Sequence, residues 1–215
     1  MATIALIGGT GFVGSAVLQE LLQHRAHSVI ALARDTGKYT PHARLRVVQA
    51  DVLDAAQVAQ AVEGADAVVS AYNPGWAHPE LHDTFLRGTR AIVDGVKRAG
   101  VQRLLVVGGA GSLFVAPGVQ LVDTPEFPAE WKQGALAARE ALAWLQTEAS
   151  LGWTFLSPPA MLKPGPRTGR YRLGGDELPM AGDHPAGVSV ADLAVALVDE
   201  LETPRHLRKR FTVSD

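Results

Sequence analysis

The feature that most constrains the fold of this chain is a cluster of glycines between two apolar segments near its beginning. Four glycines lie within residues 8–14, after the apolar run Ile4–Ile7 and before a segment of helical spacing over 12–24. Glycine weakens both helices and strands, and it is favoured where the backbone turns tightly or comes close to another group. The pattern therefore predicts a tight turn that leads from a strand into a helix.

The spacing Gly8-x-x-Gly11-x-x-Gly14 is typical of a turn that binds a dinucleotide, because it follows a predicted strand and opens a predicted helix. In such a turn the first glycine permits the bend, the second lets the backbone approach a pyrophosphate, and the third lets the helix pack closely. Free N–H groups and the helix dipole then face the phosphates. A tight turn without a ligand is the alternative. The residues predicted to bind the pyrophosphate are Gly8, Thr10, Gly11, Phe12, Val13 and Gly14.

The rest of the chain alternates short apolar runs with longer segments of helical period. The short runs are apolar throughout, which is typical of parallel strands covered on both faces. Repeated strand–helix units of this kind favour an α/β, doubly wound parallel sheet with right-handed crossovers. The predicted strands are Ile4–Ile7, Val29–Ala33, Leu45–Val48, Ala67–Ser70, Leu104–Val107 and Thr154–Ser157, with a late edge strand at Phe211–Val213. The predicted helices lie near 12–24, 55–63, 80–99, 129–149 and 190–202.

Residues 158–188 differ in composition from the remainder, since they hold much of the proline and glycine. A long irregular segment inside a compact domain is usually a functional loop or a disordered one. Because this segment follows the carboxyl end of the sixth strand, we expect a small irregular lobe on the substrate side; a plain surface excursion is the alternative. Residues 1–215 are predicted to form a single domain that includes this lobe.

Charge and cysteine content limit the classes of function. The formal net charge is −2, so no basic excess indicates a nucleic-acid or membrane partner. Cysteine is absent, which excludes disulfides, thiolate nucleophiles and cysteine-ligated metals. We expect a cytoplasmic monomer or homodimer whose partner is a small molecule. The pair His78 and His82 has helical metal-ligand spacing, but no third ligand beyond Asp83 accompanies it, and no metal site is predicted.

The segment after the second strand bears on the choice of nicotinamide cofactor. An acidic residue at this strand end binds the ribose hydroxyl of NAD, whereas an arginine suits the 2′-phosphate of NADP. Arg34 takes the strand-end position, Asp35 follows it, and Lys38 is close by. Guanidinium binds phosphate through two parallel hydrogen bonds, so NADP(H) is favoured over NAD(H). Beyond the third strand, Asp51 and Val52 are placed to contact adenine, although Asp51 can also act as a helix cap.

Six stretches of this chain resemble the atypical short-chain dehydrogenase/reductases, and within them the NADH-flavin reductase group, which is kin to biliverdin reductase B. These stretches are IALIGGTGFVGSAV, ARD, QADVLD, VVGGAGSLFV, LGWTFLSPPAM and the C-terminal SVADLAVALVDELETPRHLRKRFTV. The resemblance implies a Rossmann fold of about seven strands and a bound nicotinamide cofactor. It also implies that the glycine turn binds the pyrophosphate, Arg34 the adenosine ribose phosphate, and Asp51 and Val52 the adenine.

The chain departs from this family in its proton relay. Classical members carry Tyr-x-x-x-Lys, in which the lysine lowers the pKa of the tyrosine, plus a serine that orients the substrate. Here the residues four places after the three tyrosines are Ala43, Trp76 and Gly175. A positioned acid contributes roughly 10²- to 10⁴-fold to alcohol–ketone chemistry. A conjugated acceptor needs this help less, because it delocalises the incoming electrons and solvent can supply the proton.

The acceptor site is predicted where the fourth, fifth and sixth strands end, since folds of this type bind ligands there. The residues predicted to contact the acceptor are Ser112, Tyr72 and Trp131, with Asn73 and Trp76 as further candidates; those added to the cofactor site are Ala71, Tyr72, Gly108 and Pro158. Each also has a structural interpretation: the aromatic residues as packing groups, Ser112 as a helix cap, and Pro158 as a strand stop.

The sequence therefore predicts an NAD(P)H-dependent reductase that transfers hydride to a conjugated acceptor such as a flavin or a quinone, with FMN or FAD as a substrate. One alternative is an enzyme similar to the nucleotide-sugar epimerases and dehydratases. Another is a non-catalytic NADP(H) redox sensor that binds a regulatory partner.

Overall fold

The computed structural model describes all 215 residues and is built around one eight-stranded sheet. The strand order is β10-β14-β8-β5-β4-β1-β2-β3, and every pairing is parallel except that of β10 with β14. The chain changes direction across the sheet between β1 and β4, as in other doubly wound folds. The strands of this sheet are β1 (Thr3–Ile7), β2 (Ser28–Ala33), β3 (Leu45–Gln49), β4 (Ala67–Ser70), β5 (Arg103–Val107), β8 (Gly152–Ser157), β10 (Arg172–Gly174) and β14 (Lys209–Ser214).

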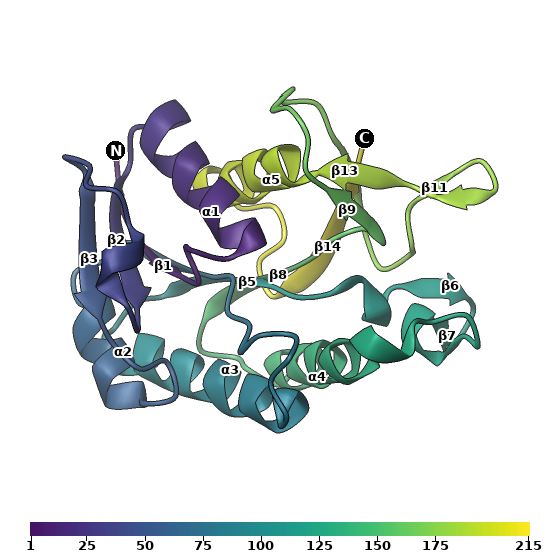
Figure 1. The fold of residues 1–215 in the computed structure, drawn as a ribbon, viewed down its shortest axis with the longest axis horizontal. Coiled ribbons are helices and arrows are strands. Elements are labelled where there is room, and N and C mark those ends of the chain that lie inside the picture. Colours follow the sequence, from purple (N-terminus) through teal and green to yellow (C-terminus); the bar gives the residue numbers. More distant parts are fainter.

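Five α-helices cover the two faces of the sheet (Figure 1). Helices α1 and α5 pack together on one face, while α2, α3 and α4 lie side by side on the other. The helices are α1 (Phe12–Gln19), α2 (Ala55–Val62), α3 (Leu81–Arg98), α4 (Ala129–Leu145) and α5 (Val190–Glu202). A π-helical turn, Glu20–His24, extends α1.

Strand β1 shows why these apolar runs form the centre of the sheet. Ile4 and Leu6 belong to the hydrophobic core under α1 and α5, whereas Ala5 and Ile7 belong to the core under α2, α3 and α4. Side chains alternate between the faces of a strand, so a strand covered on both faces needs apolar residues at consecutive positions. All four residues are at most 1% exposed.

The α/β doubly wound fold is confirmed, and the predicted strands and helices recur within a few residues of their expected bounds. The expected position of the last strand is wrong. Strand β14 is not an edge strand, because it lies between β8 and β10. The outer position is taken by β10, which comes from the segment that the sequence marks as irregular.

Residues 158–188 contain more regular structure than their composition indicates. Besides β10 they supply β9 (Met161–Lys163), β11 (Met180–Ala181) and β12 (His184–Pro185), and they lead into β13 (Gly187–Ser189), which pairs with β9. A separate hairpin of β6 (Phe114–Ala116) and β7 (Val119–Gln120) follows β5. No helix has the length and apolar character needed to cross a membrane.

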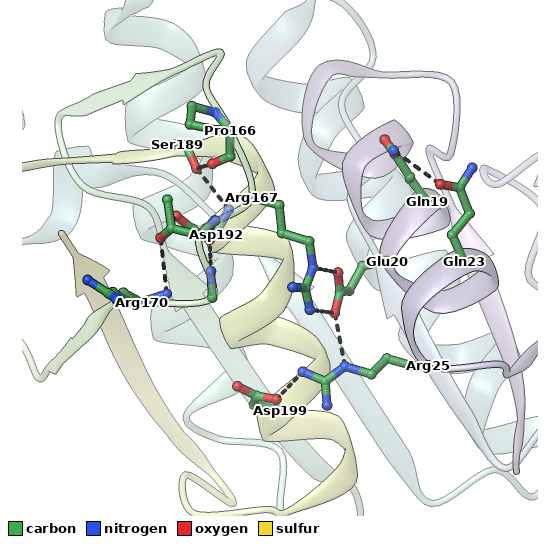
Figure 2. Close-up of polar contacts among 12 residues, drawn as sticks. Gln19, Glu20, Gln23, Arg25, Pro166, Arg167, Arg170, Ser189, Asp192 and Asp199 are labelled. Atoms are coloured by element: carbon green, nitrogen blue, oxygen red, sulfur yellow. Dashed lines mark hydrogen bonds and ion pairs between the residues drawn. The ribbon is translucent and has the colours of Figure 1, made fainter.

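Polar contacts bind the segment 158–188 to the layer formed by α1 and α5 (Figure 2). Arg167 donates two hydrogen bonds to the carboxylate of Glu20, at 2.6 and 2.9 Å. One oxygen of Asp192, in the first turn of α5, accepts from the backbone N–H groups of Thr168 and Gly169 at 2.8 and 2.7 Å. The segment is thus held at two points on the helices.

Candidate functional site

A cavity of about 520 Å³ lies where β1, β2, β3 and β4 end, and it includes the point where the strand order reverses. Open α/β sheets bind ligands at this place because the loops on either side of it separate and leave a crevice. The lining residues are Ile7, Gly8, Thr10, Gly11, Leu32, Ala33, Arg34, Asp35, Lys38, Tyr39, Ala50, Asp51, Val52, Leu53, Ala71, Tyr72, Asn73, Pro74, His78 and Thr84.

The glycine turn forms one wall of the cavity, and two of its glycines are sterically required. Gly8 has φ +80°, and a Cβ atom there would collide with the backbone carbonyl of Ala71. A Cβ atom on Gly14 would collide with the carbonyl oxygen of Gly8. Gly11 donates its N–H to the same oxygen at 2.9 Å, which closes the turn. The backbone is therefore drawn tightly around the start of α1.

The start of α1 leaves its first N–H groups available. The N–H groups of Phe12, Val13 and Gly14 have no intrahelical acceptor, and no side chain caps the helix. Phe12 is half exposed, and these three residues lie in the first helical turn just behind the cavity lining. Unpaired N–H groups and the positive end of the helix dipole together attract an anion such as a pyrophosphate.

Two cations stand at the outer edge of the cavity without partners. The side chains of Arg34 and Lys38 line the cavity, are exposed, and form neither a hydrogen bond nor an ion pair. The neighbouring carboxylate is engaged elsewhere, because Asp35 accepts the N–H of Gly37 at 3.0 Å and caps a short turn. This edge can therefore hold a phosphate dianion, and one oxygen of Asp35 is engaged within its own loop.

Asp51 and Val52 line the cavity beyond the end of β3. One oxygen of Asp51 accepts the N–H of Leu53 at 2.9 Å, and its other oxygen has no partner within the chain. The cap of α2 is Asp54, which accepts from the N–H groups of Ala56 and Gln57, so Asp51 is not needed for that role. The free oxygen of Asp51 remains available to a hydrogen-bond donor.

Comparisons with known proteins agree with this geometry. Residues 8–204 match the protein family described as NAD(P)H-binding. The chain belongs to the NAD(P)H-binding family. It is 40% identical to the uncharacterized protein YwnB of Bacillus subtilis over 213 residues, which covers 98% of this chain and 97% of YwnB.

Two solved structures are similar over nearly the whole chain. A Bacteroides thetaiotaomicron protein, provisionally named an epimerase, has a TM-score of 0.92 and 44% identity, covering 99% of this chain and 96% of its own. A Streptococcus pneumoniae protein, provisionally named an NADH-flavin reductase, has a TM-score of 0.84 and 31% identity over all of both chains. The family membership identifies the cofactor of this chain as a nicotinamide dinucleotide.

The geometry of the cavity, taken apart from the family match, also fits a nicotinamide dinucleotide. The collisions at Gly8 and Gly14 show that backbone packs directly against backbone in the turn, and the start of α1 leaves free N–H groups beside it. Gly8, Thr10, Gly11, Arg34 and Ala71 all line the cavity, and Ala71 packs directly against Gly8. The individual contacts to the cofactor stay predictions.

Tyr72 lies at the inner end of the cavity but is tightly engaged with α3. Its hydroxyl donates to the carbonyl of Thr84 at 3.1 Å, and its ring stacks against Phe85 at a centroid distance of 6.0 Å. The ring occupies the place where Gly88 lacks a side chain. Burial raises the pKa of Tyr72 to about 12. In this setting the phenol is a poor proton donor and a poor base at neutral pH.

Ser112, Gly108 and Pro158 do not line the cavity; they follow the neighbouring strands β5 and β8. Ser112 is only 2% exposed, and its hydroxyl accepts from the guanidinium of Arg210 at 3.1 Å. Arg210 also donates to the carbonyl of Ser112 at 2.7 Å. Ser112 is therefore held by strand β14, and it does not cap a helix through its side chain. Its expected contact with the acceptor stays a prediction.

Trp131 stands in the first turn of α4, is 52% exposed, and lies outside the cavity lining. Tyr39 lines the cofactor cavity, although no motif in the sequence points to it. Its hydroxyl is buried against Gly9 without a hydrogen-bond partner, and burial raises its pKa. Spacing could not reveal this, because the contact joins the glycine turn to a loop that follows the next strand.

Proposed function

We propose that this protein is an NADP(H)-dependent reductase that transfers hydride to a conjugated, planar acceptor, with a flavin or a quinone as the first candidates. The observation that carries the proposal is the state of the tyrosines beside the cofactor cavity. Tyr72 is hydrogen-bonded to the backbone, the hydroxyl of Tyr39 is buried, the pKa of each is raised, and neither is followed four residues later by a lysine. The cavity thus has the means to hold the cofactor but no phenol suited to protonate an alkoxide.

Hydride transfer to a conjugated acceptor does not need a phenol that donates a proton. When bound, reduced nicotinamide supplies a hydride, and a conjugated acceptor takes one further proton from solvent to give its dihydro form and oxidised cofactor. The task left to the protein is to orient the two rings and to exclude water between them. The glycine turn fixes the cofactor's pyrophosphate, and the loops after β4, β5 and β8 border the space where the acceptor would lie.

A preference for NADP(H) over NAD(H) is part of the proposal. Arg34 and Lys38 have no partner within the chain, although an exposed cation near carboxylates commonly acquires one. Asp35, which would favour the ribose hydroxyl of NAD, already accepts the N–H of Gly37 through one of its oxygens. A 2′-phosphate supplies the negative charge that this edge lacks, and guanidinium is well suited to bind it.

A second candidate function is epimerase or dehydratase chemistry on a small metabolite, favoured by the Bacteroides thetaiotaomicron structure and its provisional name. Such an enzyme returns the hydride to the same substrate and shows no net oxidation of the cofactor. A third candidate is a redox sensor, which binds cofactor without turnover and acts through a regulatory partner.

The test is a pair of fluorescence titrations with NADPH and NADH, followed by an acceptor assay with the cofactor that binds more tightly. The proposal expects NADPH to bind more tightly and to be oxidised in the presence of FMN or a naphthoquinone. Tight binding without oxidation by any acceptor would favour the sensor. Cofactor that copurifies with the protein and is never consumed would favour the epimerase.

We also propose that the reductase acts as a cytoplasmic monomer or homodimer on small molecules alone. Its formal charge of −2 provides no basic excess for nucleic acid or anionic lipid. Size-exclusion chromatography with light scattering tests the assembly state, and cell fractionation tests the location.

A further inference from the structure

The loop between β4 and α3 places two aromatic rings on two helical glycines. The ring of Tyr72 occupies the space above Gly88 of α3, and the indole of Trp76 occupies the space above Gly134 of α4. A Cβ atom on Gly134 would lie 2.6 Å from Cζ3 and 3.2 Å from Cη2 of the indole. Glycine inside a helix weakens it relative to alanine, so a glycine at such a position has a local steric reason. Here that reason is the close seat of an aromatic ring.

The two rings differ in what covers them. Tyr72 is stacked on Phe85 and its hydroxyl is bonded, so its seat is part of the core. Trp76 packs on Gly134 through its benzo edge, with Leu81 also beside that glycine, yet 60% of the tryptophan's surface is exposed. An indole exposed to this extent offers an apolar aromatic face on which another ring can stack.

The exposed indole is held in place rather than mobile on a loose loop. Asn73 accepts the N–H of Gly75 through its side chain at 2.7 Å, and His78 donates its N–H to the carbonyl of Gly75 at 3.0 Å. These bonds close the turn on both sides of Trp76. A ring fixed in this way loses little conformational entropy when a second ring stacks on it.

The seat of Trp76 adjoins the expected acceptor space. The loop after β5 packs against the same turn of α4. Ala135 follows Gly134 in that turn, and a Cβ atom on Gly111 of the loop would lie 2.7 Å from Cβ of Ala135. On the other side of Trp76, Asn73 and His78 line the cofactor cavity. The indole therefore stands between the cavity and the turn of α4 that supports the β5 loop, with its larger surface uncovered.

We propose that Trp76, seated on Gly134, is the platform on which the planar acceptor stacks, and that it restricts the substrates to flat, conjugated ring systems. The inference rests on the proposed function and specifies its substrate class. Flat rings pack against an indole over their whole face, whereas a saturated, puckered ring of similar size cannot.

Two variants test the platform, and a third is a matched control. Trp76→Leu removes the indole, and Gly134→Ala keeps it but fills its seat with a methyl group. The control, Trp144→Leu, changes a tryptophan that lies on α4, away from the loop that carries Trp76. Trp144 is partly buried against the core, and the guanidinium of Arg90 lies 6.0 Å from its ring. Each protein is saturated with NADP+ and titrated into FMN, with the fluorescence of the flavin as the readout. Steady-state kinetics then measure the reduction of the flat acceptor 1,4-naphthoquinone. A competition titration tests whether the saturated ketone 2-decalone displaces FMN.

The proposal expects the wild-type protein to quench the fluorescence of FMN, and both platform variants to raise the dissociation constant for FMN about tenfold. Their affinity for NADPH stays within about twofold, and the Trp144→Leu protein binds FMN like the wild type. 2-Decalone does not compete with FMN. Wild-type affinity for FMN in Trp76→Leu and Gly134→Ala overturns the platform and leaves the proposed function standing. A wild-type protein that binds NADPH but neither binds nor reduces FMN or naphthoquinone overturns both.

Discussion

The two ends of helix α1 with its π-helical extension present opposite electrostatic situations. At the N-terminal end, Arg34 and Lys38 face an open cavity and have no partners. At the C-terminal end, Glu20 is 2% exposed and lies between the guanidinium groups of Arg25 and Arg167. Figure 2 shows this carboxylate enclosed by both arginines, with Arg25 reaching on to Asp199. Charges paired within the chain hold the fold together, and charges left unpaired are available to a ligand.

The contrast has a physical origin in desolvation. Burial raises the pKa of Glu20, but hydrogen bonds from Arg167 and Arg25 outweigh burial and hold its pKa below the ordinary value. A buried charge is tolerated only with such partners, and removal of one partner leaves the others uncompensated. The cations beside the cavity are exposed, so water solvates them until a phosphate arrives.

The largest expected effect is that of Glu20→Gln. The change removes the negative charge between two partly buried arginines, and we expect the free energy of unfolding to fall by about 3 kcal/mol. Urea denaturation measures it, with Glu140→Gln as the control because Glu140 is half exposed and its ion pairs are long. The control should lie within about 0.5 kcal/mol of the wild type. A loss below about 1 kcal/mol for Glu20→Gln would contradict the structural role of this cluster.

Gly14→Ala tests the N-terminal end of α1, and it changes the packing of the glycine turn without changing any charge. The added methyl group meets the carbonyl oxygen of Gly8, which is backbone and cannot yield easily. We expect about 2 kcal/mol of destabilisation from overpacking, together with at least a tenfold loss of NADPH affinity. Urea denaturation and NADPH titration measure the two effects. A variant with intact stability and wild-type affinity would show that the turn is looser than described.

Arg34→Asp tests whether the unpaired charges beside the cavity serve cofactor binding and not folding stability. Loss of a charge-assisted phosphate contact should weaken NADPH binding by about 1.5 kcal/mol, roughly tenfold, with NADH affinity unchanged or improved. The free energy of unfolding should stay within about 0.5 kcal/mol, because Arg34 has no partner to lose. Parallel titrations with both cofactors give the ratio, and unchanged NADPH affinity would refute the assignment of Arg34.

The smallest expected effect is a change in acid sensitivity. The pKa of Glu20 in the folded protein lies below its ordinary value of 4.5, so the unfolded chain binds a proton more readily. The contribution of Glu20 to stability is therefore complete above about pH 4.5 and is lost as the pH falls through the folded pKa. Unfolding measured at pH 7 and pH 4 should show a shallower decline in Glu20→Gln than in the wild type. Equal declines would mean that Glu20 does not titrate in this range.

The five α-helices and seven of the eight strands of the main sheet could be predicted from local spacing alone. The run Ile4–Ile7, the glycines between 8 and 14 and the helical period that follows are adjacent in sequence, and each acts through neighbours within a few residues. Arg34 could be placed at a strand end for the same reason. The cofactor half of the candidate site is therefore largely visible in the sequence.

What joins these elements was decided by tertiary structure. Arg167 meets Glu20 across 147 positions, and Arg210 meets Ser112 across 98. Strand β10 covers the sheet edge although its three residues have no strand pattern of their own, because the unpaired backbone of β14 supplies the hydrogen bonds. Periodicity records which face of an element is apolar, but a contact between distant side chains depends on how the whole chain packs. The sequence alone determined the helices, the parallel strands of the main sheet and the glycine turn, and only packing determined the edge strand β10 and which charges remained free for a ligand.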